Sequence, residues 1–289
     1  MPTPAGTSPD SIGRLLADRL SRALGQSVVA ENITGAGGLI ASRTAAKAAP
    51  DGYTLYFSGT GALITDRYTQ KNLGYDPDRD FTLIAMIYEE GSLALAVHPE
   101  VPVKTLPDLI ALARQQPGKV SYGTTSVSLL ILFGQWITRL AGIDMLAVPY
   151  KAASFAWPAM LAGEVQASYF ALTSAAVAMV KSGKARTLAV TLEKRLPELP
   201  DVPTYKEAGI EFPLVTWFGL CGPKGTPREI VVKLNREINA GLAHPAMRAK
   251  LAELGHIVFG GAPADFSDFI SQEITKWAKV IRAAGITTD

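Results

Sequence analysis

The stretch "VVAENITGAGGLIASRTAAKAAPDGYTLYFSGTG", residues 28–61, decides the fold class. It reads as an apolar strand, a glycine cluster from Gly35 to Gly38, a helix rich in small residues, and a second apolar strand. This order is that of a βαβ unit, which in dinucleotide-binding proteins places a pyrophosphate at the helix N-terminus. The stretch therefore predicts an α/β unit and raises the question of whether its glycines bind a nucleotide.

Two features of the same stretch argue against a nucleotide site. The dinucleotide fingerprint needs a third glycine, and Ile40 stands at that position. The following strand ends in "YFSGTG" without the acidic residue that would hold a ribose, and no Gly-Lys-Ser/Thr follows the glycines. The cluster is interpreted as a tight turn that lets the helix begin close to the strand.

Outside this stretch, strand and helix patterns alternate, as expected of an α/β protein with largely parallel sheets. Residues 27–32 are predicted as a strand, and two helices, at 227–243 and 263–285, are predicted to close the chain. A chain of 289 residues can form two domains, and no linker separates them. We therefore expect strands to cross between domain 1 (residues 1–98 plus 221–289) and domain 2 (99–220).

Composition excludes several classes of protein. A net charge of +2 with scattered basic residues does not fit nucleic-acid binding. The single cysteine, Cys221, cannot form an intrachain disulfide, and no apolar run is long enough to span a membrane. The chain starts with "MPTPAGTSPD", a loop that leads into a helix. We therefore expect a signal peptide and a first strand upstream of Met1.

Catalytic and metal-binding patterns are also missing from the sequence. His98, His244 and His256 do not have the spacing of zinc ligands, and no Gly-x-Ser-x-Gly elbow supplies a nucleophile. No metal or cofactor is expected. An enzyme that uses Ser126 or Ser128 stays open as an alternative, and it would need a base within hydrogen-bond reach of the serine.

Four loops that precede helical segments share glycine or small residues and hydroxyl groups. Such loops collect at the carboxyl ends of parallel strands, where backbone N–H groups and helix N-termini can bind an anion. Two loops fall in each of the two predicted domains, which predicts a ligand held in an interdomain cleft that closes by a hinge motion. The loops are "PAGTSPD" (4–10), "SGTGA" (58–62), "GTTSVS" (123–128) and "YKAAS" (150–154).

The chain as a whole resembles the Bug-type solute-binding receptors of tripartite tricarboxylate transporters. Matching segments include "LGYDPDRDFTLIA" (73–85), "VPVKTLPDLIALARQQPGKVSYG" (101–123), "SGKARTLAVTLEKRLPELPDVPTYKEAG" (182–209) and "TWFGLCGPKGTPREIVVKLN" (216–235). The resemblance implies a type II periplasmic-binding-protein fold, α/β in class, with two domains. It also implies a periplasmic location and delivery of a small carboxylate to membrane permease subunits.

The resemblance and the hydroxyl loops together give the expected ligand-binding residues. They are Gly6, Thr7, Ser8 and Asp10; Ser58, Gly59, Thr60 and Gly61; Thr124, Thr125, Ser126 and Ser128; and Ala153 and Ser154. Phe170 is added because the family often has an aspartate there, which could meet a ligand amino group. Its replacement argues against an amino-acid ligand and favours a carboxylate with an apolar or aromatic body.

The function expected from the sequence is a receptor, not an enzyme, that binds a small organic carboxylate and acts as a monomer. A receptor that signals through a partner sensor uses the same closed surface and stays an alternative. The enzyme with a serine nucleophile is the second alternative.

Overall fold

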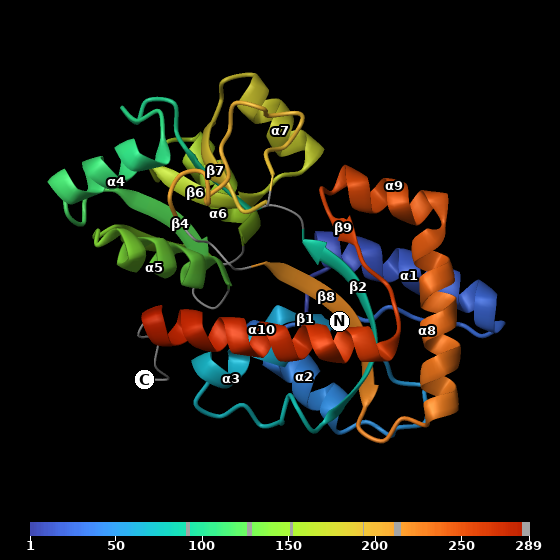
Figure 1. Ribbon diagram of the computed structural model, residues 1–289. Coiled ribbons are helices and arrows are strands. Elements are labelled where there is room, and N and C mark those ends of the chain that lie inside the picture. The colour runs from blue at the N-terminus through green and yellow to red at the C-terminus, as the bar shows by residue number, and fades with distance from the viewer. Residues whose placement is uncertain (91–92, 126–128, 151–152, 193, 211–214, 285–289) are drawn as a thin grey trace. The chain divides into compact units, whose positions relative to one another are not determined.

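The computed structural model describes residues 1–90, 93–125, 129–150, 153–192, 194–210 and 215–284. Contacts between Cα atoms divide the chain into two compact units. Unit 1 comprises Met1–Glu89 and Thr216–Asp289, and unit 2 comprises Glu90–Val215. Both units combine helices with a β-sheet (Figure 1), as the α/β prediction requires.

Unit 1 is built on a four-stranded sheet with the strand order β1-β8-β2-β9. Its strands are β1 (Tyr56–Gly59), β2 (Phe81–Glu90), β8 (Thr216–Pro223) and β9 (Ile257–Val258). Its helical elements are α1 (Ser8–Leu24), η1 (Ala36–Gly38), α2 (Leu39–Ala46), η2 (Gly61–Thr65), α3 (Asp66–Thr69), α8 (Arg228–Ala243), α9 (Pro245–Glu253) and α10 (Pro263–Ala284).

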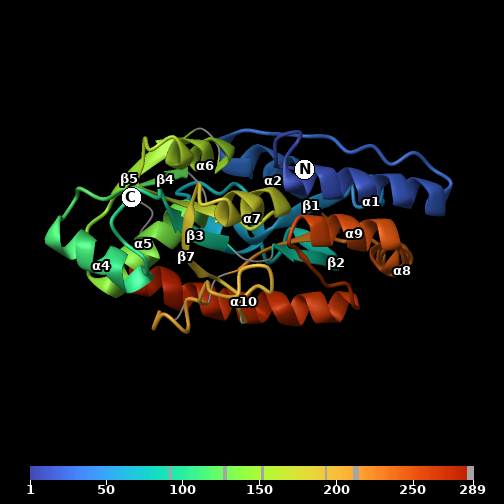
Figure 2. The ribbon, with the colours of Figure 1, turned by 90° about the horizontal axis from the view of Figure 1, so that it is seen from above.

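Helices cover both faces of this sheet. The side chains of β8 point alternately to the two faces, so both faces carry apolar side chains that the helices cover. Leu220 packs into a core that α1 shares with α8 and α9, and Phe218 packs against the same core. Trp217 points the other way and meets Phe266 and Phe269 of α10, with ring centroids 5.6 and 5.4 Å away. Figure 2 shows α1 and α10 on opposite sides of β1 and β2.

Unit 2 contains a five-stranded sheet with the order β5-β4-β6-β3-β7. Its strands are β3 (Leu93–Val97), β4 (Ser121–Thr125), β5 (Leu146–Tyr150), β6 (Ala167–Ala171) and β7 (Arg186–Val190). Its helices are α4 (Leu106–Gln115), α5 (Leu129–Ala141), α6 (Ala153–Leu161) and α7 (Ser174–Lys181). Thr105 caps α4 in a capping box with Asp108.

The path of the chain around β4 explains the placing of α5 and α6. After β4, α5 leads to β5 on one side, and α6 then returns the chain to β6 on the other side of β4. Right-handed crossovers in opposite directions put their helices on opposite faces of a parallel sheet. Figure 2 shows α5 and α6 on the two sides of β4.

The sheets are mixed, so the expectation of largely parallel sheets is wrong. The strands β4, β5 and β6 are parallel, but β3 runs antiparallel to both β6 and β7. In unit 1, β1 with β8 and β2 with β9 are antiparallel pairs. The strands β3 and β8 each come directly after the chain has passed from one unit to the other. There β3 runs antiparallel to β6 and β7, and β8 runs antiparallel to β1.

The chain passes from one unit to the other at Glu89/Glu90 and at Val215/Thr216, whereas the predicted boundaries are residues 98 and 220. β3 pairs with the unit 2 strands β6 and β7, and β8 pairs with β1 of unit 1. Each passage of the chain therefore comes before β3 or β8 begins, and each of these strands belongs to the sheet in which it pairs.

Residues 27–32 do not form the predicted strand. They lie outside all helices and strands, and the Val29 side chain is exposed. The backbone of this segment bonds to scattered groups: the Val28 N–H donates to Ser21 Oγ at 2.8 Å, and the Met1 amino group donates to the Glu31 carbonyl oxygen at 2.7 Å. A strand needs a neighbouring strand as a ladder of backbone partners, which these contacts do not supply.

The glycine cluster forms the predicted turn into α2. Gly35, Gly37 and Gly38 have φ values of 122°, 67° and 101°, which residues with a Cβ atom rarely adopt. The helix α9 and the strand β9 were not predicted. His244 begins α9, since its Nδ1 accepts a hydrogen bond from the Ala246 N–H at 3.2 Å.

Gly59 tests the contact between β1 and β8. A Cβ atom at this position would lie 2.0 Å from the carbonyl oxygen of Trp217, a backbone atom that cannot move aside without breaking the strand pair. We expect Gly59→Ala to lower the free energy of unfolding by about 3 kcal/mol in urea denaturation.

Gly61→Ala is the matched control, since its Cβ would meet nothing closer than Asp66 Oδ1 at 3.7 Å. Its expected loss is below about 1 kcal/mol. Equal losses for the two variants would contradict the close approach of β1 and β8.

Candidate functional site: the hydroxyl loops

The first loop, residues 4–10, brings the chain to the N-terminus of α1. Thr7 occupies the capping position, yet its hydroxyl donates to the Pro4 carbonyl oxygen at 2.8 Å and does not cap the helix. The first N–H groups of a helix have no partner within the helix, and together with the helix dipole they attract anions. The Thr7 side chain therefore satisfies none of the N–H groups at the start of α1.

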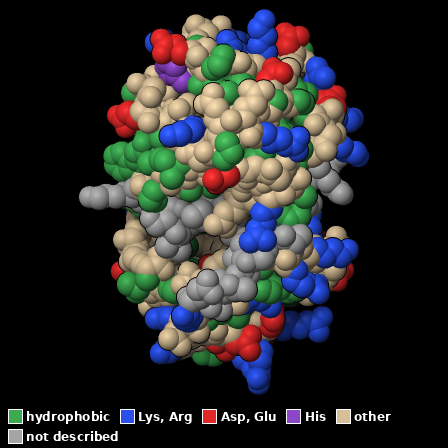
Figure 3. All heavy atoms as spheres, turned by 90° about the vertical axis from the view of Figure 1, so that its left-hand side faces the viewer, with side chains coloured by type: hydrophobic (Ala, Val, Ile, Leu, Met, Phe, Trp, Pro, Cys, Tyr) green, Lys and Arg blue, Asp and Glu red, His purple; other side chains and the backbone are tan. Residues whose placement is uncertain are grey.

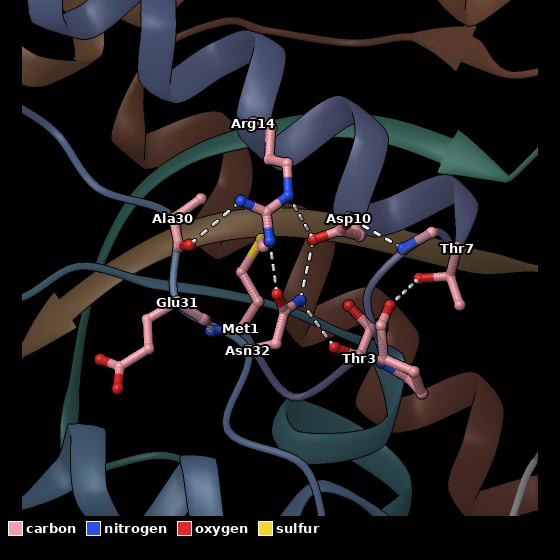
Figure 4. A network of polar contacts seen from close by, with 10 residues as sticks. Met1, Thr3, Thr7, Asp10, Arg14, Ala30, Glu31 and Asn32 are labelled. Atoms are coloured by element: carbon pink, nitrogen blue, oxygen red, sulfur yellow. Dashed lines mark hydrogen bonds and ion pairs between the residues drawn. The ribbon is translucent and has the colours of Figure 1, made fainter.

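Asp10 holds this loop in place from the first turn of α1. Its carboxylate accepts hydrogen bonds from the Gly6 N–H at 2.9 Å and from Asn32 Nδ2 at 2.8 Å, and it forms an ion pair with Arg14 Nε at 3.0 Å (Figure 4). Asn32 also donates to the Thr3 carbonyl oxygen. The carboxylate has three donors around it, so it acts as a support for the loop.

The charge of Asp10 is maintained by these contacts. Burial of the side chain acts to raise its pKa, but hydrogen bonds from Asn32, Gly6 and Arg14 outweigh burial and hold the pKa below its usual value. Arg14 is engaged in turn by Asp10 and by the Asn32 Oδ1 atom. Asp10 was expected at the site, whereas Asn32 was not, because no motif links two positions 22 residues apart. Arg14 was also not expected, although it stands four residues after Asp10 on the same helix.

Ser8 has an unexpected neighbour in His256, which precedes β9. The Ser8 Oγ and His256 Nε2 atoms lie 2.5 Å apart, and the imidazole stacks on the Tyr88 ring with a centroid distance of 4.6 Å. Only 8% of His256 is exposed, and burial lowers its pKa to about 4. The imidazole is therefore neutral at neutral pH.

A serine beside a histidine raises the question of nucleophilic catalysis. A base of this kind needs a pKa near the working pH and a third group that orients its other nitrogen. The pKa of His256 is too low for that role, and its Nδ1 atom has no hydrogen-bond partner within the described part of the chain. The pair does not have the chemistry of an activated nucleophile.

The second loop, Ser58–Gly61, is fixed on β8. Gly59 lies opposite Phe218, and the Thr60 Oγ1 atom accepts a hydrogen bond from the Trp217 N–H at 3.1 Å. Ser58 and Thr60 are buried. Asp66 lies five residues after Gly61 in the sequence. Burial raises the pKa of its carboxyl group to about 6, although a hydrogen bond from the Tyr75 hydroxyl acts to lower it.

The unit 2 loops begin where β4 and β5 end side by side. These strands are parallel, with Thr124 opposite Pro149 and Thr125 opposite Tyr150. Both loops therefore begin at the carboxyl ends of the strands, on the same side of the sheet's end, as predicted. Thr124 is buried, and its Oγ1 atom has no partner among the described residues. Ser126 and Ser128 lie outside the described residues, and Ala153 and Ser154 form the start of α6.

Phe170 lies in the core of unit 2. It is 6% exposed and stacks on Trp157 of α6, with ring centroids 3.9 Å apart. Trp157 packs against the same apolar core. Contact between Phe170 and a ligand stays a prediction.

The surface charge, the side-chain clusters and the helices were compared with what nucleic-acid binding, metal binding and membrane spanning require. On the face in Figure 3, Lys and Arg side chains are interspersed with Asp and Glu, without a continuous basic stripe among the described residues. Within the same residues, no cluster of three His, Cys, Asp or Glu side chains is arranged to hold a metal ion. No helix in the described ranges combines the length and the apolar character needed to cross a bilayer.

The sequence model of the tripartite tricarboxylate transporter family receptor matches residues 12–286. The chain belongs to this family. Protein BugT of Bordetella pertussis is 34% identical over 99% of this chain and 88% of its own length. The expected membership of the Bug-type receptors is thereby confirmed.

Solved structures agree with this assignment. The R. palustris protein Rpa4515 with adipate is 36% identical, with a TM-score of 0.89 over 100% of this chain and 96% of that one. MatC from Rhodopseudomonas palustris with bound malate is 30% identical, with a TM-score of 0.85 over 97% and 96% of the two chains. The fold is that of a periplasmic solute-binding protein, and the family consists of receptors and not of enzymes.

Asp10 and Asp18 form a matched pair of tests on α1, since each has an arginine four residues later. The Asp10 side chain is 5% exposed and the Asp18 side chain 49%. We expect Asp10→Asn to lower the free energy of unfolding by about 2 kcal/mol, because its donors lose a buried charged acceptor. Asp18→Asn should change it by less than about 0.5 kcal/mol in the same urea titration. Losses of similar size would contradict the supporting role of Asp10.

His256 predicts a pH dependence of stability. Its pKa of about 4 in the folded chain lies below the ordinary value of 6.5, so between these values the unfolded chain binds more protons and acid destabilises the fold. His256→Phe keeps an aromatic ring against Tyr88 and removes the titration. Relative to the wild type, the variant should gain about 2 kcal/mol on going from pH 7.5 to pH 4.5.

Comparison with the wild type is needed because Asp66 acts in the opposite direction. Its raised pKa of about 6 means that the folded chain binds more protons there, so Asp66 favours the fold as pH falls through that range. Chemical denaturation at the two pH values measures the difference. Parallel pH profiles for wild type and His256→Phe would exclude a depressed pKa at His256.

Proposed function

We propose that this protein is an extracytoplasmic receptor that captures a small organic carboxylate for a tripartite transporter and leaves the ligand chemically unchanged. The observation that carries the proposal is that two solved relatives of the same fold, matched over nearly the whole chain, hold the dicarboxylates adipate and malate. The periplasm is the proposed place of action, since the relative BugD is a periplasmic binding protein. The proposed partners are the membrane permease subunits, and the receptor acts as a monomer.

The hydroxyl loops supply the chemistry that a carboxylate needs. Ser8 and Thr60, together with the free N–H groups at the start of α1, are neutral donors. Arg14, the basic residue of the Asp10 network, is already paired with Asp10. We propose that the ligand carboxylate is bound by dipoles and hydroxyls of residues 6–8 and 58–61, with Thr124, Thr125, Ser126, Ser128, Ala153 and Ser154 as the contribution of unit 2.

The body of the ligand is the second part of the proposal. Position 170 is a phenylalanine, so no carboxylate at this position is available to pair with a ligand ammonium group. An apolar chain between the carboxylates, as in adipate, fits this composition better than an amino acid does.

A thermal-shift screen followed by calorimetry tests the function. Ligand that binds only the folded chain raises the melting temperature, and at 100 times the Kd it adds about 2.7 kcal/mol of stability. We expect adipate to raise the melting temperature and glutamate to leave it unchanged. Adipamide, which has the same methylene chain without charge, is the matched control and should have no effect. The proposal fails if adipate, malate and hexanoate all leave the melting temperature unchanged, or if adipamide acts as adipate does.

A further inference from the structure

His256 is held firmly in unit 1 by contacts on its backbone and its ring. Its N–H donates to the Leu251 carbonyl oxygen at 2.8 Å, and the ring lies on Tyr88 of β2 at an interplanar angle of 15°. One ring nitrogen, Nε2, meets Ser8 Oγ, whereas the buried Nδ1 has no partner in the described part of the chain. The ring therefore has one polar contact, and that contact is with the predicted anion loop.

The unpartnered Nδ1 atom decides which tautomer the neutral ring adopts. With the proton on Nδ1, a buried N–H donor would have no acceptor, a situation that folded proteins very rarely tolerate. With the proton on Nε2, the ring donates to Ser8 Oγ, and Nδ1 keeps only an unused lone pair. The contacts favour the second tautomer.

The tautomer determines what Ser8 can offer to a ligand. If Nε2 accepted the hydrogen bond, the Ser8 proton would be used on His256, and the oxygen lone pairs would face the anion. If Nε2 donates, Ser8 accepts with a lone pair and its own O–H stays available as a donor. Ser8 is also the first residue of α1, where backbone dipoles favour negative charge.

We propose that His256 is a positioning residue of the carboxylate site: its Nε2–H donates to Ser8 Oγ and so directs the Ser8 hydroxyl proton to the ligand carboxylate. The inference rests on the proposed function, which it extends to a residue outside all four hydroxyl loops. It gives His256 a role that needs a neutral ring and a hydrogen bond of defined direction, and it needs no proton transfer.

The tautomer can be measured without a ligand. In protein labelled with ¹⁵N-histidine, long-range ¹H–¹⁵N correlation spectra distinguish a protonated from an unprotonated ring nitrogen, and His256→Phe assigns the signals. We expect the His256 signals at pH 7.5 to show a protonated Nε2 and an unprotonated Nδ1. A protonated Nδ1 beside an unprotonated Nε2 would overturn the inference.

Binding is then tested with a double-mutant cycle, using adipate as the probe in calorimetry. Ser8→Ala and His256→Phe should each weaken binding about tenfold, and the double variant should be no weaker than Ser8→Ala alone. His256→Gln, whose amide N–H can donate to Ser8, should stay within about threefold of the wild type. His244→Phe removes another unit 1 histidine, one that caps α9, and is the control expected to bind normally. Circular dichroism confirms that each variant is folded.

The outcomes separate the inference from the function on which it rests. If wild-type protein binds none of adipate, malate and hexanoate, the proposed function fails and the inference fails with it. If the wild type binds but the two single losses add in the double variant, the function stands and the positioning role of His256 is wrong. The same conclusion follows if folded His256→Gln binds as weakly as His256→Phe.

Discussion

The buried carboxylate of Asp10 is the interaction on which the proposed site depends. It joins the turn at Gly6, the arginine one helical turn later and the amide of Asn32, so it ties the first loop, α1 and the segment before the glycine cluster together. A carboxylate can remain charged in a buried position only if donors surround it. The same contacts neutralise Arg14, and the donors that remain for a ligand in this loop are uncharged.

A site made of uncharged donors suits a transport receptor. A ligand has to be released as well as captured, and a desolvated ion pair with a lysine or arginine would oppose release. Hydroxyls and N–H groups that are already fixed in position, such as Thr60 on β8 and Ser8 beside His256, gain selectivity from direction and lose little entropy on binding. The low pKa of His256 keeps this arrangement neutral over the whole physiological pH range.

Local patterns predicted local structure well. The helix of α1 and the turn at Gly35–Gly38 follow from backbone conformations that neighbouring residues determine. Resemblance to the receptor family supplied the fold and the role. The prediction of a strand at residues 27–32 was wrong because strand formation depends on a partner elsewhere in the chain. The antiparallel direction of β3 and β8 was not predicted for the same reason.

Two of the supporting residues of the site could not be found from the sequence. Asn32 reaches Asp10 from 22 positions away, and His256 reaches Ser8 from 248 positions away. No spacing rule connects such pairs, because tertiary packing alone brings them together. Arg14 differs from them, since an arginine four residues after Asp10 on the same helix is a pairing that helical spacing indicates.

A crystal structure of the protein grown with adipate would show whether these uncharged donors bind the ligand. We expect a carboxylate oxygen within hydrogen-bond distance of Ser8 Oγ and of an N–H group at the start of α1, with Asp10 still bound to Arg14 and Asn32. Adipate bound with both carboxylates away from residues 6–8 and 58–61, or paired directly with Arg14, would contradict this expectation.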